Sequence, residues 1–446
     1  MQLPLPHFTP EDANLVHPDI LTLPDRVERL RRLLTRDLNF HGHTVPDPLH
    51  RLHPFPAKFP PQLPRLFIQH LTEPGQTILD PMMGSGTTLL EAQHLHRQAL
   101  GNDIDPLALT LVAAKSQPPT AAQWARTWPT LIAQGQDWMR REQALRRIHQ
   151  KRFDAETQRF LNYWFLPETQ RALLALTLAI EQITELKLRR FARVIFSSLI
   201  IAKSGSVAQA RDLSHTRPHR VERPPKPVFD LFAQKAQRAE RMLRSRQEAS
   251  HVTSRIIEAD AQRMPWKSSS IDLVVTSPPY AANAIDYMRA HKFTLVWWGY
   301  SVHQLRNRRR GYIGGEAIQG QRGSRLPNKA EEVIEDIAAI DTKKASSLRR
   351  YFTEMRNVFQ EIARVIRPGG FAIIVVGDST MRGRSTRTPE VLAVLGEDAG
   401  LQHIGTGKRM LDRDRRMMPT RHGRITSSIE RRMHVEYVLG FHRPLS

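Results

Sequence analysis

The chain has 446 residues, of which 40% are hydrophobic and 25% are charged, and its formal net charge is +22. This composition is typical of a globular protein with two or three domain-sized units, and it excludes a disordered or membrane-spanning chain. The excess of 66 lysines and arginines over 44 acidic residues favours a polyanionic partner, most simply a nucleic acid. Because the sequence contains no cysteine, it can form no disulfide, thiolate zinc site or cysteine nucleophile.

The N-terminal sequence lacks the basic start and apolar core of a signal peptide, so we expect a cytoplasmic protein. Residues 24–39 have the apolar spacing of an amphipathic helix with a basic face, and residues 62–71 are expected to form another helix. The proline-rich segment 51–61 between them can be neither a helix nor an inner strand. Its two phenylalanines and one lysine suit a ligand that is part aromatic and part carboxylate.

Residues 76–92 are predicted to form a strand, a glycine turn and a helix. The glycines permit close approach of the backbone, and the helix start at Thr87 directs N–H groups at a ligand above it. The turn is neither a P-loop nor a dinucleotide-binding G-x-G-x-x-G turn. Asp80 at the strand end instead suits an ammonium group, and Asp103, roughly 20 residues further along at the end of the next strand, suits a ribose diol.

The alternation of strands and helices stops between residues 118 and 252, where we expect helices over 130–152, 168–202 and 229–246. We interpret this stretch as a basic helical insertion, which divides the chain into 1–117, 118–252 and 253–446. A loop within it carries donors that suit phosphates and base edges, although a solvated loop explains them equally well. These candidate donors are Arg211, His215, Arg217 and Arg220.

The α/β pattern resumes with expected strands over 255–261, 271–276, 371–376 and 434–441, and expected helices over 348–366 and 389–395. Residues 317–345 are polar and are expected to be mobile. Two arginine-rich segments, 300–345 and 408–432, compete with the insertion for the role of recognising a nucleic acid. Their candidate phosphate contacts are Arg308, Arg309, Arg310, Arg415, Arg416 and Arg421.

The strand over 271–276 runs into Thr276-Ser277-Pro278-Pro279-Tyr280. Two consecutive prolines prevent both further strand pairing and an immediate helix, so the chain stops in a stiff turn at the carboxyl edge of the sheet. Ligands bind at that edge in open α/β sheets. The Ser277 hydroxyl, the free carbonyls and the Tyr280 ring suit a flat heterocycle with an exocyclic amine. The alternative, an ordinary strand ending in a proline turn, is disfavoured by the ligand cleft expected upstream.

Two motifs together, Asp80-Pro81-Met82-Met83-Gly84-Ser85-Gly86-Thr87 and Thr276-Ser277-Pro278-Pro279-Tyr280, resemble the S-adenosylmethionine-dependent amino-methyltransferases of DNA, which act on cytosine N4 or adenine N6. The segment Pro56-Ala57-Lys58-Phe59 resembles the family motif that precedes the glycine turn. The resemblance covers residues 50–115 and 255–440. It implies an α/β, Rossmann-like class I methyltransferase with a seven-stranded, mostly parallel sheet, an antiparallel last strand and a helical insertion.

The resemblance also implies roles for individual residues. Asp80 and the two glycines would hold the methionine end of S-adenosyl-L-methionine, Asp103 its ribose and Asp260 its adenine amino group. The full set of cofactor-binding candidates is Phe55, Ala57, Lys58, Phe59, Asp80, Pro81, Gly84, Gly86, Thr87, Asp103, Ile104, Asp260 and Ala261. No metal is expected. Double-stranded DNA is the expected partner, a restriction endonuclease is a candidate second partner, and a bacterial or archaeal cytoplasm is the expected location.

The catalytic candidates are Ser277, Pro278, Pro279 and Tyr280. We expect the target base to leave the duplex stack and lie on Tyr280, while the Ser277 hydroxyl and the Pro278 carbonyl accept hydrogen bonds from its amine. Serine at this position resembles the cytosine-N4 enzymes more than the adenine-N6 enzymes, where aspartate or asparagine is usual. An RNA guanine-N2 methyltransferase and a non-catalytic, cofactor-dependent DNA-binding subunit are the rival hypotheses. Cytosine C5 chemistry would need a thiol, which the chain lacks.

Overall fold

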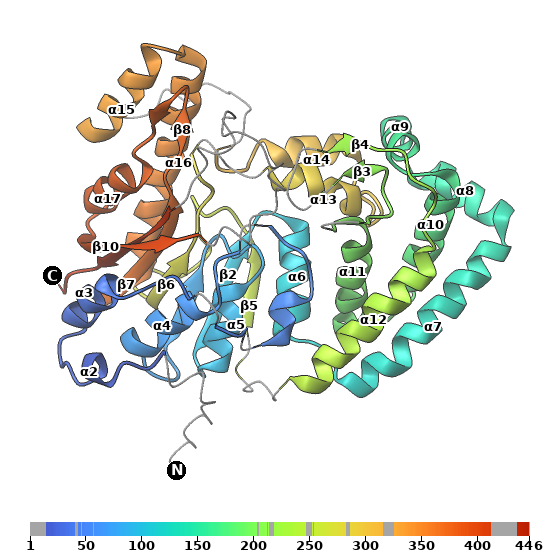
Figure 1. Ribbon diagram of the computed structural model, residues 1–446, viewed down its shortest axis with the longest axis horizontal. Helices are drawn as coiled ribbons and strands as arrows, with labels where there is room; N and C mark the ends of the chain where they lie inside the picture. The colour runs from blue at the N-terminus through green and yellow to red at the C-terminus, as the bar shows by residue number, and fades with distance from the viewer. Residues whose placement is uncertain are drawn as a thin grey trace, which may run out of the picture.

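The computed structural model describes residues 15–40, 43–45, 47–56, 58–202, 205–211, 213, 218–246, 252, 254–281, 286–314, 325–411 and 435–445. Within them, seven strands form one sheet in the order β10-β11-β7-β6-β1-β2-β5 (Figure 1). The strands are β1 (Thr77–Asp80), β2 (Gln98–Asp103), β5 (Ser254–Glu258), β6 (Ile271–Thr276), β7 (Ile366–Gly377), β10 (Gln402–Met410) and β11 (Val435–His442). Strand β11 is antiparallel to both neighbours, whereas the pairs among β7, β6, β1, β2 and β5 are parallel. This topology confirms the predicted Rossmann-like α/β fold.

Helices cover both faces of the sheet because its central strands are apolar on both sides. Leu273 and Val275 of β6 join a core with the helices on one face, whereas Val274 joins the core on the other face. The first face carries α3 (Arg26–Thr35), α4 (Gln62–Leu71) and α5 (Thr87–His94), and the second carries α15 (Asn328–Ala338), α16 (Thr342–Val365) and α17 (Thr388–Asp398). The remaining elements of this half are α2 (Pro18–Leu21), η1 (Pro48–Arg51), α6 (Pro106–Ser116), β8 (Thr380–Met381) and β9 (Arg384–Ser385).

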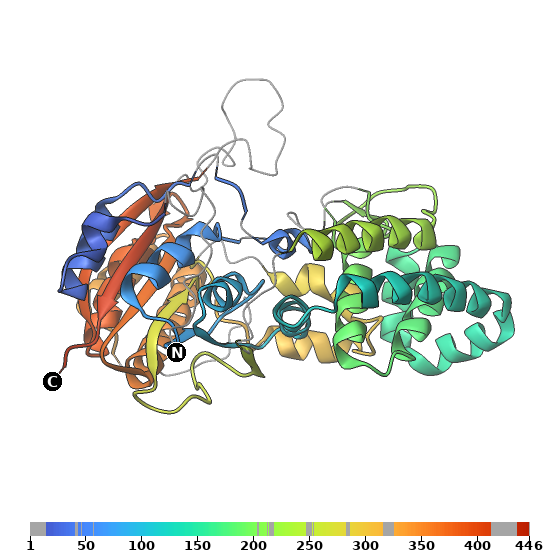
Figure 2. The ribbon, with the colours of Figure 1, turned by 90° about the horizontal axis from the view of Figure 1, so that it is seen from below.

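A helical body lies beside the sheet, and the two halves give the molecule an elongated outline (Figure 2). The body consists of α7 (Ala121–Arg140), α8 (Glu142–Arg152), α9 (Ala155–Trp164), α10 (Pro167–Glu181), α11 (Leu186–Ile200), the short pair β3 (Ala210–Arg211) and β4 (His219–Arg220), and α12 (Val228–Ser245). Two later helices, α13 (Tyr287–Leu295) and α14 (Val302–Arg309), share its core. Among the buried aromatic residues of this core are Trp124, Phe191, Phe293 and Trp297. The chain therefore enters the helical body a second time, soon after the proline turn.

The structure corrects several predicted boundaries. Residues 328–338 form a packed helix rather than a mobile polar segment, because α15 buries Ala330, Val333, Ile334 and Ile337 on one helical face. Strand β7 begins at Ile366 rather than at residue 371, since the Gly369 N–H still bonds the Arg443 carbonyl at 2.8 Å.

The expected long helices of the insertion also break, at Arg141 and between α10 and α11. Residues 408–410 of the expected arginine-rich loop lie in β10, and residues 412–434 lie outside the described part of the chain. No helix of the described residues is both long enough and apolar enough to cross a bilayer.

Candidate active site

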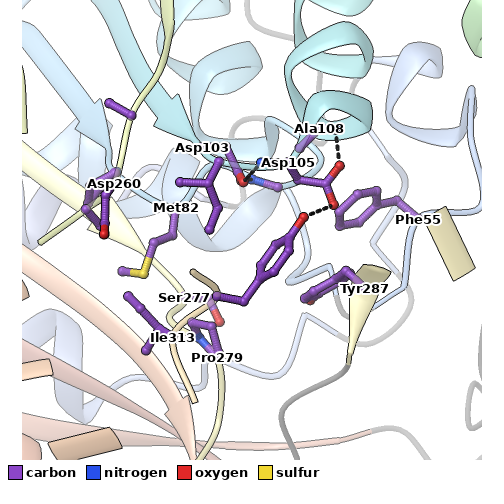
Figure 3. Close-up of a pocket in the computed structure, with 16 residues that line it drawn as sticks. Phe55, Met82, Asp103, Asp105, Ala108, Asp260, Ser277, Pro279, Tyr287 and Ile313 are labelled. Atoms are coloured by element: carbon purple, nitrogen blue, oxygen red, sulfur yellow. Dashed lines mark hydrogen bonds between the residues drawn. The ribbon is translucent and has the colours of Figure 1, made fainter. Parts of the chain in front are cut away.

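A cleft of about 620 Å3, including the solvent at its mouth, lies at the carboxyl ends of β1, β2, β5 and β6. In Figure 3, Asp103 and Asp105 lie on one side of this cleft, and Ser277 and Pro279 lie across from them. The cleft is lined by Phe55, Pro81, Met82, Gly84, Asp103, Ile104, Asp105, Ala108, Ala259, Asp260, Ala261, Ser277, Pro279, Tyr287, Tyr312 and Ile313. The structure therefore brings residues from both predicted motifs to one space, although they are nearly 200 positions apart in sequence.

The glycine turn forms the floor of the cleft. Gly86 is the N-cap of α5 and has a φ of +75°, in the left-handed region that glycine tolerates best. Beneath the turn, the buried Lys115 donates its Nζ to the Ser85 carbonyl at 2.8 Å. A backbone held in this way presents Gly84 to the cleft in a fixed position.

Asp80 lies below the cleft surface and links the two motifs. Its Oδ1 accepts a hydrogen bond from the Thr276 hydroxyl at 2.7 Å and another from the Met82 N–H at 3.2 Å. Burial raises the pKa of the Asp80 carboxyl to about 6, and these two donors oppose that increase. Asp80 thus ties the end of β1 to the end of β6, immediately before Ser277.

Asp103 faces the cleft from the end of β2. Its two carboxylate oxygens accept backbone N–H groups, Oδ2 from Gly84 and Oδ1 from Asp105, each at 2.9 Å. Burial, followed by the charge of Asp105, raises the pKa of Asp103 to about 7. Each carboxylate oxygen has room for a second hydrogen bond, so hydroxyl donors from a ligand would stabilise the charged form.

A second acid, Asp105, joins the cleft to the helical body. Its Oδ2 lies 2.5 Å from His291 Nδ1 and accepts the Tyr312 hydroxyl at 3.0 Å. Burial acts to raise the pKa of Asp105, but the neighbouring His291 and these hydrogen bonds hold it below its ordinary value. Phe55 stacks on Tyr287, with ring centroids 5.3 Å apart, so this wall of the cleft combines the proline segment with the start of α13.

The proline turn after β6 presents its residues in two directions. Ser277 and Pro279 line the cleft, whereas Pro278 is buried beside it. The Tyr280 hydroxyl donates to Glu436 Oε1 on β11 at 2.9 Å. Tyr280 is not one of the residues that line the cleft in the described part of the chain. The ring is therefore anchored to β11 and packs against the core of the sheet.

Asp260 and Ala261 follow β5 and complete the cofactor-binding candidates that line the cleft. Gly86 and Thr87 lie in its supporting floor rather than on its surface. Two further candidates, Lys58 and Phe59, do not line the cleft in the described structure. The Lys58 Nζ donates to the carbonyls of His50 and His53. Phe59 packs on the core of the sheet. Ala57 lies outside the described residues.

Several predicted DNA contacts already have partners within the protein. Arg308 pairs with Glu258 at 2.6 Å and Arg309 with Asp286 at 2.6 Å, whereas Arg310 is exposed. Arg220 lies over the Tyr163 ring, 4.7 Å from its centroid, and Arg211 is an exposed residue of β3. The candidates His215, Arg217, Arg415, Arg416 and Arg421 lie outside the described residues.

Among the lining residues that sequence reasoning missed are Asp105, Tyr287, Tyr312 and Ile313. Asp105 had a local signal, because an acid directly before a proline is a helix N-cap, and its Oδ1 does bond the Leu107 N–H at 2.7 Å. The other three lie on and after α13 and α14, where no motif marks them. No group of three or more metal-ligating side chains is placed to hold a metal in the part of the chain that the structure describes.

The strand order and the cleft at the strand ends define a Rossmann-like class I methyltransferase. A family model described as DNA methylase, of the N6/N4 type, matches residues 34–114. The type II methyltransferase M.MvaI of Kocuria varians is 24% identical over 410 residues, which are 86% of this chain and 88% of that protein. The type II methyltransferase M.MjaII of Methanocaldococcus jannaschii is 38% identical over 69 residues, 16% of this chain and 13% of that protein. The family-model match and the similarity to M.MvaI both support the DNA amino-methyltransferase family for this chain.

Two solved structures show weaker likeness. A DNA modification methylase from Thermus thermophilus, complexed with S-adenosyl-L-methionine, has 21% identity and a TM-score of 0.22, over 42% of this chain and 54% of its own. A SAM-dependent methyltransferase from Methanosarcina mazei has 9% identity and a TM-score of 0.33, over 85% of this chain and 98% of its own. Scores this low carry no argument, so the fold rests on the strand order given above.

Proposed function

We propose that this chain transfers a methyl group from S-adenosyl-L-methionine to the exocyclic amine of a base in double-stranded DNA, with cytosine N4 as the preferred acceptor. The observation that carries the proposal is the shared cleft, in which Ser277 and Pro279 lie opposite the carboxylate of Asp103. The similarity to the DNA amino-methyltransferase family supports the class of reaction. The net charge of +22 supports the polyanionic substrate.

The residues of the cleft fit the cofactor. Asp103 has two carboxylate oxygens, each with one backbone donor, and would accept the two hydroxyls of a ribose. Asp260 and Ala261 would hold the adenine end, and Gly84 would hold the methionine end close to the backbone. When bound, the cofactor supplies an electrophilic methyl group on a sulfonium. Asp105, held by His291 and Tyr312, would fix the cleft wall beside the ribose.

The proline turn would position the acceptor amine. The Ser277 hydroxyl and the Pro278 carbonyl would accept its N–H groups, which keeps the nitrogen lone pair out of the ring and available for in-line attack. Such catalysis consists of positioning and preorganised hydrogen bonds, without a covalent enzyme intermediate. Because the Tyr280 hydroxyl is bonded to Glu436, the Tyr280 ring would offer a fixed face on which a flipped base can stack.

Adenine N6 remains the second candidate acceptor, because the Ser277 hydroxyl can accept a hydrogen bond from either amine. Serine in place of the acidic or amide residue of typical adenine enzymes favours cytosine. The named relatives are type II methyltransferases, which supports a modification enzyme with a cognate endonuclease.

Transfer of labelled methyl groups to mixed-sequence duplex DNA tests the proposal. The wild-type protein should label DNA but not RNA, and Ser277→Ala should lower kcat by about 10- to 100-fold if its hydroxyl bonds the amine in the transition state. Ser268→Ala is the matched control, since Ser268 lies in the turn before β6 and outside the cleft. Full activity of Ser277→Ala would contradict the amine contact, and labelling of RNA alone would contradict the DNA substrate.

A further inference from the structure

A second cavity lies behind the proline segment, between that segment and the helical body. It is lined by Arg51, Leu52, His53, Pro54, Lys58, Ile195, Ser198, Ala202, Lys235, Arg238, Ala239 and Met242, and its volume is about 1240 Å3 with the solvent at its mouth included. Helix α12 contacts η1 at this place, where the helical body meets the other half of the molecule (Figure 2). We call it the basic cavity.

The described lining of the basic cavity contains four lysines or arginines and no acid. Lys235 and Arg238 lie one helical turn apart on α12, and Arg51 comes from the end of η1. None of these three forms a salt bridge with a carboxylate of the described residues. Gathered cations without counter-charges repel one another, so the folded protein would gain from a bound anion.

The back of the cavity holds a buried histidine with an unused ring nitrogen. His53 is 1% exposed, and its Nε2 lies 2.9 Å from the Ser197 hydroxyl. Its Nδ1 has no hydrogen-bond partner among the described residues. Burial, followed by the nearby charges of His291, Lys115, Lys58 and Lys235, holds the pKa of His53 well below its ordinary value. When the Ser197 hydroxyl donates to Nε2, the neutral ring carries its proton on Nδ1, which is itself buried.

We propose that the basic cavity binds a phosphoryl group through Lys235, Arg238 and Arg51. The same stiff segment that carries His53 and Lys58 carries Phe55, which lines the cofactor cleft on its other side. The group could belong to the DNA backbone, in which case the inference rests on the proposed function, or to a free phosphate.

Binding of a labelled mixed-sequence duplex, measured by fluorescence anisotropy without cofactor between about 50 and about 200 mM salt, tests the DNA source. The double variant Lys235→Gln/Arg238→Gln should reduce the slope of log affinity against log salt by about 2, one for each lost phosphate contact. Arg241→Gln is the matched control, because it removes a positive charge from an exposed position of α12 outside the cavity. The charge-conserving variant Lys235→Arg/Arg238→Lys should keep the slope of the wild type.

Calorimetric titration with inorganic phosphate tests the free source. Phosphate binding by the wild type that is lost in Lys235→Gln/Arg238→Gln, with an unchanged DNA slope, would assign the cavity to a free phosphate. An unchanged slope together with no phosphate binding would overturn the inference, as would an equal effect of Arg241→Gln. Loss of the proposed function would show instead as absence of methyl transfer by the wild type, which neither binding measurement reports.

Discussion

Substitution of Gly86 by alanine tests whether the glycine turn is built as the structure has it. Gly86 has a φ of +75°, and a Cβ added there would lie 2.8 Å from Val112 Cγ2 and 2.9 Å from Val112 Cγ1. The left-handed conformation costs about 1–2 kcal/mol for a residue with a side chain. Crowding against two methyl groups of a packed helix adds about 1–3 kcal/mol. We therefore expect Gly86→Ala to lower the free energy of unfolding by about 2–5 kcal/mol.

Urea denaturation followed by circular dichroism measures this loss, and Gly383→Ala separates its two parts. Gly383 has a φ of +82°, but nothing lies within 4 Å of its Cβ position, so only the conformational cost of about 1–2 kcal/mol applies. In the double variant Gly86→Ala/Val112→Ala, the smaller helix residue should relieve the crowding and give a coupling energy of about 1–3 kcal/mol. A Gly86→Ala loss no larger than that of Gly383→Ala, or a coupling energy near zero, would refute the close contact between turn and helix.

Two further predictions concern buried carboxyl groups. Thr276→Val removes the hydroxyl that donates to Asp80, so we expect a loss of about 1–3 kcal/mol of stability, against less than about 1 kcal/mol for Thr110→Val, whose hydroxyl bonds only its own helix. Equal losses of stability in Thr276→Val and Thr110→Val would contradict the hydrogen bond that joins the two motifs. The pKa of Asp103 is raised to about 7 in the folded protein. Between the ordinary pKa of Asp and about 7, the folded protein therefore holds a proton that the unfolded chain has released. The free energy of unfolding falls as pH rises through this range. Urea denaturation at about pH 5 and about pH 8 should show a smaller fall for Asp103→Asn than for the wild type, and an identical fall would contradict the buried carboxyl.

The strand ends of the cleft could be predicted from sequence because their signals are local. Predicted strands that lead into Asp103, Asp260 and Ser277 place those residues at one edge of a parallel sheet, and the structure has them at that edge. The wall formed by Tyr287 and Tyr312 could not be predicted in this way. Its position depends on the packing of α13 and α14 into the helical body, a long-range arrangement that no spacing in the segment encodes.

The proline segment shows a second limit of sequence reasoning. Its stiffness and its place beside the cleft follow from its prolines, and Phe55 does line the cleft. The direction of the Lys58 side chain, in contrast, depends on hydrogen bonds within the folded segment. Its Nζ donates to the carbonyls of His50 and His53, and Lys58 therefore lines the basic cavity. The helix α15 was also not predicted, because its apolar face is short and is buried only by long-range packing against α16.

The most direct test of the central claim is mass spectrometry of nucleosides from the DNA of a host that lacks base methylation and expresses this protein. We expect N4-methylcytosine in that DNA and none in the DNA of cells that express Ser277→Ala. N6-methyladenine instead would overturn the preferred acceptor and retain the enzyme class. DNA without either modified base, from cells that contain the folded protein, would contradict the account.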